Sequence, residues 1–271
     1  MSTVRQPAVA GAFYPGDAES LALEVASLLQ EAGHTADAEA PLPKAVIVPH
    51  AGYVYSGPVA ASAYARLKAG RGRVRRVVLL GPCHRIAVRG LALPGATEFA
   101  TPLGRIPVDR EAAAAVQDLP QVTVSAQAHA FEHSLEVQLP FLQAVLGDFA
   151  LLPLAVGDAA ADDVATVLER LWGGDETLIV ISSDLSHYLP YDVAKRVDSV
   201  TARAILAMEH TIDHSQACGA TPVDGFLLAA KRRGMTPELL DLRNSGDTAG
   251  DRSRVVGYAA FAFNEARAHV H

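Results

Sequence analysis

Residues 45–53 read Ala-Val-Ile-Val-Pro-His-Ala-Gly-Tyr, and this stretch decides the fold of the 271-residue chain. A short apolar run rich in β-branched residues and bounded by Pro and Gly is typical of a strand buried on both faces. Residues 77–85, Val-Val-Leu-Leu-Gly-Pro-Cys-His-Arg, repeat that order. Each run places a histidine, His50 or His84, just past the carboxyl end of a predicted strand. Ligands of open α/β sheets gather at that edge, so we expect the two histidines to meet there.

Strands and helices alternate along the rest of the chain. Further buried strands are predicted at 149–156, 178–181, 239–242 and 255–263, with helices at 18–32, from about Pro58 to 67, at 132–146, 161–171, 191–209 and 222–233. Short extended pieces at 91–93, 96–101 and 104–108 suggest that part of the sheet is antiparallel, and Asp109 is expected to cap a helix. The expected fold class is α/β: a single three-layer α/β/α domain over residues 1–271 with a mixed, largely parallel central sheet.

The composition favours a globular, enzyme-like protein. Half of the residues are apolar, 20% are charged, and the formal net charge is −7, which argues against nucleic acid as a partner. The short basic stretch at 71–76 leads into a predicted strand and is interpreted as a solvated loop. No apolar run is long enough to cross a bilayer and no signal pattern opens the chain, so we expect a cytoplasmic protein without a membrane partner. Two cysteines, Cys83 and Cys218, are too few for disulfide bonds to stabilise a chain of this size.

Titratable side chains follow three of the predicted strands. His50 and His84 follow two of them, and the strand at 178–181 is followed by Asp184 and His187. A lone histidine at a strand end is more often a hydrogen-bonded structural residue, and loop Asp and His residues commonly satisfy turn backbone. Packing of the core does not require titratable residues at the ends of three strands, however. The three occurrences together therefore indicate a functional site. Cys218 lies before a glycine at the start of a predicted helix.

Glu132, His133 and Glu136 open the helix predicted at 132–146. Glu132 and Glu136 are four residues apart and would share a helix face. Leu135 and Val137 flank Glu136, and a partly buried carboxylate needs a partner.

Two imidazoles and one anionic ligand form an arrangement that non-haem Fe(II) favours. A thiolate as the third ligand leaves Fe, Cu and Zn open, since two histidines and one cysteine also form a catalytic zinc site. The residues alone do not choose among these metals.

Five ordered motifs resemble the Memo family, whose prokaryotic members are called AmmeMemoRadiSam system protein B. They are Pro-His-Ala-Gly-Tyr at 49–53, Gly-Pro-Cys-His-Arg at 81–85, Glu-His-Ser-Leu-Glu-Val-Gln-Leu-Pro-Phe at 132–141, Ser-Ser-Asp-Leu-Ser-His-Tyr at 182–188 and Ala-Cys-Gly at 217–219. The opening residues 5–15 and the closing residues 256–260 also fit, so the resemblance covers nearly the whole chain.

The resemblance implies a fold like that of the class III extradiol (LigB-type) dioxygenases. It implies that His50, His84 and Cys218 are metal ligands, and that Asp184 and His187 line the pocket, with His187 as the catalytic base. It also implies iron or copper binding and a redox role, with Fe(II) expected first and Cu or Zn as alternatives. A radical-SAM protein and an AMMECR-domain protein are the partners that it implies.

Residues around these ligands are expected to support them. Glu132, His133 and Glu136 would supply hydrogen bonds that orient the histidines, and Tyr53 and Cys83 would lie beside the site. Relatives usually carry a small polar residue where this chain has Cys83. Two thiols facing one pocket would allow oxidation to release the metal, whereas a Cys83 turned into the core would not take part.

Two other functions remain open at this stage. The first is a non-catalytic protein that binds a metal or peptide, or serves a radical-SAM system. The second is a zinc-dependent hydrolase with Glu136 or Asp184 as the base. A serine hydrolase or P-loop enzyme is not expected, because the sequence has neither a Gly-x-Ser-x-Gly elbow nor a Gly-rich phosphate loop.

Overall fold

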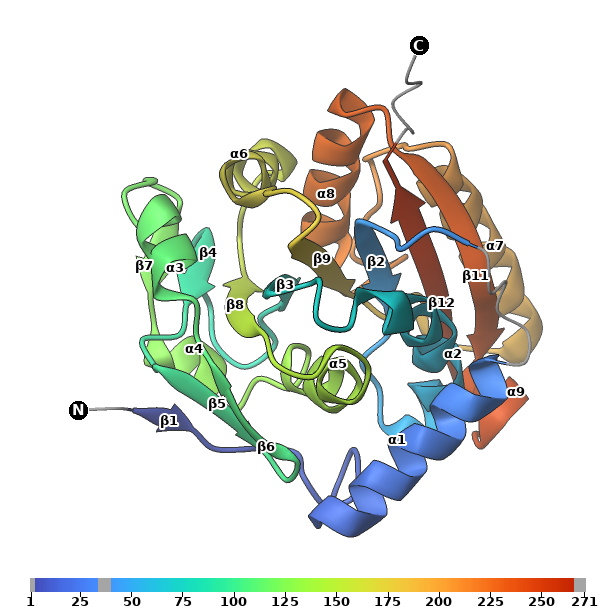
Figure 1. The fold of residues 1–271 in the computed structure, drawn as a ribbon. Coiled ribbons are helices and arrows are strands. Elements are labelled where there is room, and N and C mark those ends of the chain that lie inside the picture. Colours follow the sequence, from blue (N-terminus) through green and yellow to red (C-terminus); the bar gives the residue numbers. More distant parts are fainter. Residues whose placement is uncertain (1–2, 34–39, 266–271) are drawn as a thin grey trace.

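A computed structural model describes residues 3–33 and 40–265 of the chain (Figure 1). Within these residues one large sheet has nine strands, in the order β10-β12-β2-β9-β3-β8-β4-β7, with β11 paired to β12. The strands are β2 (Ala45–Val48), β3 (Arg76–Pro82), β4 (Leu91–Leu93), β7 (Val122–Val124), β8 (Ala150–Val156), β9 (Thr177–Ser182), β10 (His187–Leu189), β11 (Thr236–Asn244) and β12 (Val255–Asn264).

The centre of this sheet is parallel and its two sides are mixed. β2, β9, β3 and β8 pair in parallel. β12 lies antiparallel to β2, and β4 lies antiparallel to β8. The predicted mixed, largely parallel sheet is therefore confirmed. Because β2, β3 and β9 run in the same direction, the loops that follow them leave the sheet at one edge.

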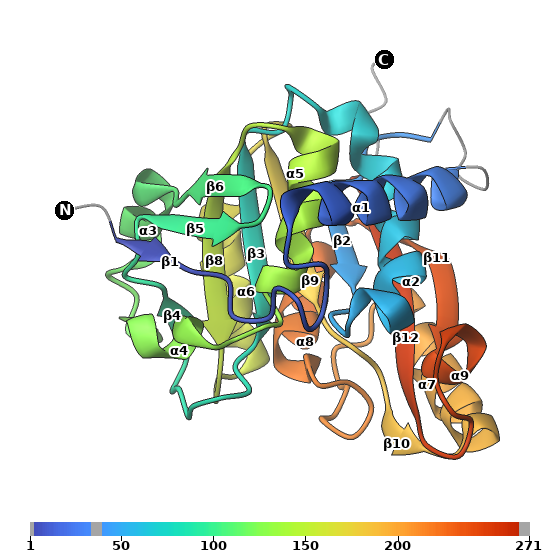
Figure 2. The ribbon, with the colours of Figure 1, turned by 90° about the horizontal axis from the view of Figure 1, so that it is seen from below.

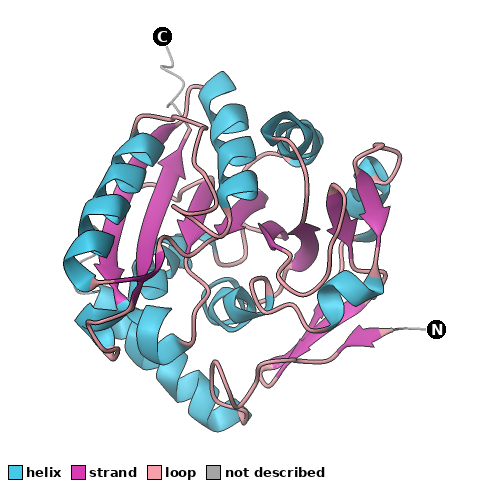
Figure 3. Ribbon diagram, turned by 180° about the vertical axis from the view of Figure 1, so that it is seen from behind, coloured by secondary structure: helices cyan, strands magenta, loops and turns pink. Residues whose placement is uncertain are grey.

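Helices cover both faces of the sheet, as the view from behind shows (Figure 3). Along β2, Val46 and Val48 belong to one apolar core, and Ala45 and Ile47 belong to the other. Residues of α1 (Ala18–Gly33), α2 (Tyr53–Arg66) and α5 (Leu139–Leu146) pack in the first core. Residues of α3 (Arg110–Val116), α6 (Ala161–Leu171), α7 (Tyr191–Leu206) and α8 (Ala220–Arg232) pack in the second. This alternation gives the predicted three-layer arrangement.

A small second sheet ties the amino-terminal segment to the body of the protein (Figure 2). β1 (Val4–Arg5) pairs in parallel with β5 (Glu98–Thr101), which pairs antiparallel with β6 (Gly104–Pro107). The remaining short elements are the 3-10 helices at Leu67–Gly70 and Glu136–Gln138, α4 (Ala126–Ala130) and α9 (Ser245–Thr248).

The helix predicted over 132–146 is wrong in its first half. Residues 131–135 form turns and irregular backbone, a 3-10 helix covers Glu136–Gln138, and α5 begins at Leu139. Pro140 explains the late start, since proline is tolerated in the first helical turn but not farther along. Glu132 and Glu136 therefore do not share a helix face.

The start of α2 also differs from the prediction. This helix begins at Tyr53, five residues before Pro58. The backbone N–H groups of Tyr55 and Ser56 both donate to the carbonyl oxygen of Gly52, so the first turn forms directly after the motif that carries His50.

Candidate metal centre

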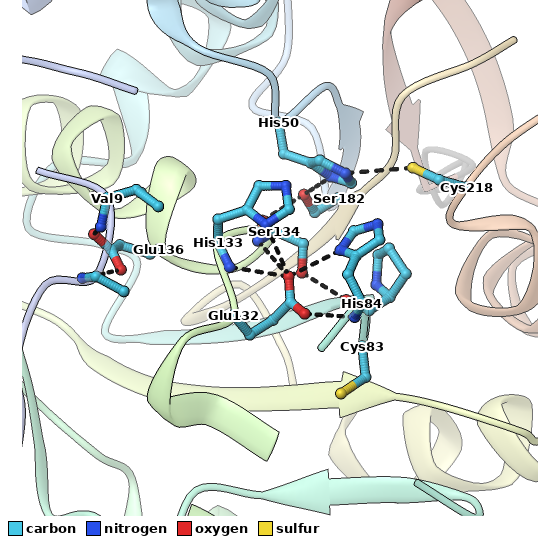
Figure 4. A network of polar contacts seen from close by, with 12 residues as sticks. Val9, His50, Cys83, His84, Glu132, His133, Ser134, Glu136, Ser182 and Cys218 are labelled. Carbon is cyan, nitrogen blue, oxygen red and sulfur yellow. Dashed lines mark hydrogen bonds and ion pairs between the residues drawn. The ribbon is translucent and has the colours of Figure 1, made fainter. Parts of the chain in front are cut away.

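Three histidines converge at the edge of the sheet where β2 and β3 end (Figure 4). The ring centroids of His50 and His84 lie 5.3 Å apart, those of His50 and His133 lie 5.4 Å apart, and those of His84 and His133 lie 4.8 Å apart. One ring nitrogen from each lies within 4.8 Å of the others. The predicted meeting of His50 and His84 is confirmed, and His133 joins them.

The tautomer of His50 follows from its hydrogen bonds. Its Nδ1 lies 2.8 Å from the Ser182 hydroxyl oxygen. That hydroxyl donates its own proton to the Ser134 carbonyl oxygen, so it can only accept from His50. Nδ1 is therefore the protonated nitrogen, and Nε2 carries a lone pair. Burial, together with the charges of His133 and His84, lowers the pKa of His50 well below its usual value, which keeps the ring neutral.

Glu132 orients His84 in the same way. Its Oε2 accepts the backbone N–H of His84 at 2.5 Å, and its Oε1 lies 2.9 Å from His84 Nδ1. Oε1 also accepts the backbone N–H groups of His133 and Ser134. Burial raises the pKa of Glu132, but the hydrogen bonds and charge of His84 and the bond from Ser134 outweigh burial and lower it to about 2. The ionised carboxylate accepts a hydrogen bond from Nδ1–H, which leaves Nε2 as the His84 nitrogen that can bind a metal.

His133 has a ring nitrogen without a hydrogen bond. Its Nδ1 is buried and lies 3.3 Å from Glu132 Oε1, but off the hydrogen-bond direction, so it has no partner among the described residues. The ring packs against Phe13, with centroids 5.0 Å apart. Burial lowers the pKa of His133 to about 4, with smaller and opposing effects from neighbouring charges, so this imidazole is neutral as well.

Cys218 approaches the histidines from the opposite wall (Figure 4). Its Sγ lies 3.3 Å from His50 Nε2 and accepts the backbone N–H of Asp184, also at 3.3 Å. Burial and the neighbouring Asp184 raise the pKa of the thiol to about 12. Ionisation of this thiol at neutral pH therefore requires a cation beside it.

Asp184 and His187 line the same cavity of about 600 Å³ as His50, His84, His133 and Cys218. Asp184 accepts the backbone N–H of His50, and burial raises its pKa to about 7. His187 Nδ1 donates to the Leu185 carbonyl oxygen at 2.8 Å, which leaves a lone pair on its Nε2. Burial lowers the pKa of His187. The cavity therefore holds a carboxyl group that can titrate near neutral pH and an imidazole with an acceptor nitrogen.

Three residues that were predicted to support the site make their contacts elsewhere. Glu136 binds the amino-terminal segment through Arg5, the backbone N–H groups of Ala8 and Val9, and the Tyr14 hydroxyl. This arrangement excludes Glu136 from orienting the histidines, and Figure 4 shows it on the far side of His133.

Tyr53 and Cys83 also face away from the histidines. The Tyr53 hydroxyl donates to the Val137 carbonyl oxygen, and its ring packs on Phe141 in the core. The Cys83 sulfur contacts the Ile86 carbonyl oxygen at 3.3 Å, and Figure 4 shows it directed away from Cys218. The two thiols therefore do not share one pocket.

Sequence reasoning missed the polar side chains behind His50. Ser182 links His50 to Ser134, and Gln138 Nε2 donates to both Ser182 Oγ and the Pro49 carbonyl oxygen. Ser182 and Gln138 are completely buried. The sequence did offer a signal for both residues. Ser182 ends an apolar strand and Gln138 lies among apolar residues, and a polar side chain buried in such a place needs a hydrogen-bond partner.

The donor set fits a transition metal. Two imidazoles direct Nε2 toward the site, each held by a hydrogen bond at Nδ1, which is the usual arrangement around metal-binding histidines. An unpartnered imidazole nitrogen and a thiol are close by. Nitrogen and sulfur donors suit zinc, copper and iron better than magnesium or calcium.

The fold and site together define an α/β protein with a candidate metal centre at the carboxyl edge of its parallel strands. Residues 5–262 match the family model described as Memo-like protein. MEMO1 family proteins of Aquifex aeolicus (36% identical over 272 residues, 96% of this chain and 99% of the relative) and Archaeoglobus fulgidus (37% over 277 residues, 96% and 99%) are similar over nearly their full lengths. The chain belongs to the Memo family.

A solved structure shares the fold. It is the crystal structure of the uncharacterized protein JW3007 from Escherichia coli K12, with a TM-score of 0.55 and 13% sequence identity over 82% of this chain and 100% of that chain. In the part of the chain that the structure describes, no helix combines the length and apolar character needed to span a membrane.

Proposed function

We propose that this Memo-family protein is a metal-dependent redox protein, with Fe(II) as its first candidate metal and Cu or Zn as alternatives. His50 and His84 would bind the metal through Nε2, and Cys218 would bind it as a thiolate. The observation that carries the proposal is the pair of Nε2 lone pairs, set by Ser182 and Glu132, with the Cys218 sulfur 3.3 Å from one of them.

The metal, when bound, would supply electrons and open coordination positions for dioxygen and a substrate, as in other non-haem iron sites with two histidines and one anionic ligand. Replacing a carboxylate ligand by a thiolate changes the electronics of the metal. We therefore propose oxygen-dependent redox chemistry of the kind that LigB-type dioxygenases perform, but not ring cleavage itself.

The other residues of the cavity supply proton transfer. His187 is neutral and has a free Nε2, which suits it to accept a proton from a substrate hydroxyl in the cavity. Asp184, with its pKa near 7, can hold that proton or return it. Burial of His50 and Asp184 keeps bulk water from competing at the back of the site.

His133 competes with Cys218 for the place of third ligand. Its ring nitrogen lies within 4.8 Å of the ligand atoms of His50 and His84, whereas Cys218 is not part of that group. We assign the third position to the Cys218 thiolate because its Sγ lies 3.3 Å from His50 Nε2 and lines the same cavity, and His133 is the alternative third ligand.

Two alternatives use the same centre. A metal-binding protein that serves a radical-SAM protein and an AMMECR-domain protein would bind metal without consuming oxygen. A zinc hydrolase would use Asp184 as its base, since Glu136 is committed to the amino-terminal segment.

Metal analysis together with oxygen uptake tests the proposal. The wild type and the variants H84A, C218A and H133A are purified without oxygen and supplied with Fe(II), Cu(I) or Zn(II). His210, which does not line the cavity, provides the control H210A. We expect near-stoichiometric iron or copper in the wild type and H210A, and its loss in H84A and C218A.

The outcomes separate the functions. Metal without oxygen uptake across a substrate screen would favour the binding protein, and activity with zinc alone would favour the hydrolase. If H133A loses the metal and C218A retains it, the third ligand is His133 and not the Cys218 thiolate. No metal in any sample would refute the site.

A further inference from the structure

The metal cavity continues into a second lobe of about 420 Å³. The two lobes share His133, Asp184, His187 and Tyr188. The second lobe is also lined by aromatic side chains and one arginine: Phe13, Tyr55, Tyr258 and Arg254. A molecule with one end at the metal can therefore extend past His187 into a pocket of different chemistry.

Tyr188 stands at the junction of the lobes in an unusual backbone conformation. Its φ angle is 58°, a left-handed value that a bulky residue rarely adopts, and the residue is 63% exposed. The pairing of β10 with β12 shifts register between His187 and Leu189. In a regular strand His187 and Tyr188 would point to opposite faces. Here both line the cavity, with ring centroids 5.8 Å apart. Strain of this kind at a cavity is typical of functional positions.

Arg254 lines the second lobe and lies over the Tyr188 ring. Its guanidinium carbon lies 5.1 Å from the ring centroid, and it forms no ion pair with any residue from 3–33 or 40–265. The lobe contains two carboxylates. Asp184 accepts the backbone N–H of His50, and Asp251 accepts that of Ser253 at 2.6 Å. The lobe therefore holds an arginine without an acidic partner above an aromatic ring.

We propose that Tyr188 and Arg254 form a subsite for the carboxylate group of a substrate with a flat, unsaturated or aromatic body. The guanidinium would bind the carboxylate through two parallel hydrogen bonds, and the body would stack against Tyr188 and its aromatic neighbours. A carboxylate is favoured over a phosphate dianion because the lobe offers one cation. The proposal deepens the proposed function and rests on it in one respect, since the other end of the same substrate would lie at the metal.

Binding of small probes to the metal-free full-length protein tests the subsite. Benzoate, neutral benzamide and phenylphosphonate are titrated by ligand-observed NMR against the wild type, R254Q and Y188N. Asparagine tolerates the left-handed backbone, so Y188N removes the ring and leaves the local fold in place. R252Q is the matched control, because Arg252 is a neighbouring exposed arginine that stacks on Tyr191 and does not line the lobe.

We expect benzoate to bind the wild type and R252Q equally, and to bind R254Q at least about tenfold more weakly, as the loss of a charge-assisted contact requires. Y188N should weaken benzoate and benzamide alike. Equal binding of benzoate by R254Q and the wild type, equal weakening in R252Q, or no benzoate binding by the wild type would overturn the proposal. Tighter binding of phenylphosphonate than of benzoate would overturn the carboxylate assignment.

The variant H84A separates this proposal from the proposed function. It should lose metal yet bind benzoate as the wild type does. Loss of benzoate binding in H84A would refute a subsite that is independent of the metal, whereas a wild type that binds benzoate but no metal would refute the proposed function alone.

Discussion

Replacing Glu132 by glutamine tests the reasoning that sets the histidine tautomers. The Glu132 carboxylate is buried and accepts four hydrogen bonds: three at Oε1, from His84 Nδ1 and the N–H groups of His133 and Ser134, and one at Oε2, from the N–H of His84. The amide that replaces it keeps one acceptor oxygen. If that oxygen occupies the Oε1 position, the new NH₂ group faces the His84 N–H at a separation of 2.5 Å.

The expected cost has two parts. A buried N–H that loses its acceptor destabilises the fold by about 1–3 kcal/mol. The bond to His84 Nδ1 becomes a neutral one, which makes Nε2 a weaker donor to a metal. Losing a partner of this kind typically lowers metal affinity about 10- to 100-fold, or about 1.4–2.7 kcal/mol.

The assay is a metal titration against a competing chelator, with thermal unfolding of the same metal-free samples. E136Q is the matched control, because Glu136 is equally buried and also accepts several hydrogen bonds, none of them from a site histidine. We expect both variants to lose stability and only E132Q to lose metal affinity.

Two results would refute the reasoning. One is an unchanged metal affinity in E132Q, within about twofold, which would show that Glu132 does not tune His84. The other is an equal loss of affinity in E136Q, which would show that general loosening of the fold is responsible.

Three further predictions concern residues around this centre. S182A should lower metal affinity about tenfold, because the acceptor that holds His50 Nδ1–H is lost; a chelator competition measures this. C83A should retain the metal that C218A loses, because the Cys83 sulfur faces away from the site; metal analysis of the two variants checks it. D198N should be more stable than the wild type at pH 7–8 by up to about 3 kcal/mol. Burial raises the pKa of Asp198 to about 6, so the folded protein binds the extra proton and loses stability as the pH rises from about 4 to about 6. Denaturant unfolding across that range measures it.

Each of these predictions has a result that contradicts it. Wild-type affinity in S182A would mean that the His50 ring is oriented by packing alone. If C83A loses the metal and C218A keeps it, Cys83 and not Cys218 is the thiol that binds the metal. A D198N curve with the same slope between pH 4 and 6 as the wild type would assign that slope to other groups.

Local patterns in the sequence were sufficient for the central strands. The apolar runs of β2, β3, β8 and β9 are each buried along most or all of their length, and their alternation with helices indicates a parallel arrangement. The short strands β1, β7 and β10 were not predicted. Each has two or three residues, too few for a hydrophobic period, and each is formed by pairing with a distant segment.

The amino-terminal half of the predicted helix at 132–146 shows where local reasoning failed. Its residues have ordinary helical spacing, but Glu132 accepts backbone N–H groups of its own turn and of His84, 48 positions away. Glu136 is held by Arg5, 131 positions away. Contacts at such separations leave no periodic signal, because either partner has an acceptable local conformation without the other.

The sequence by itself determined the three-layer α/β fold and the placement of His50 and His84 at one edge, because burial on both faces and the breaks at Gly and Pro are local properties of the chain. The tertiary structure alone decided that His133 joins them, that Cys83 does not, and that Ser182 and Glu132 choose the tautomers. Those outcomes depend on the direction of side chains and on which hydroxyl or carboxylate is within 3 Å of a ring nitrogen. Hydrogen-bond geometry at that scale is set only when the packed elements have met.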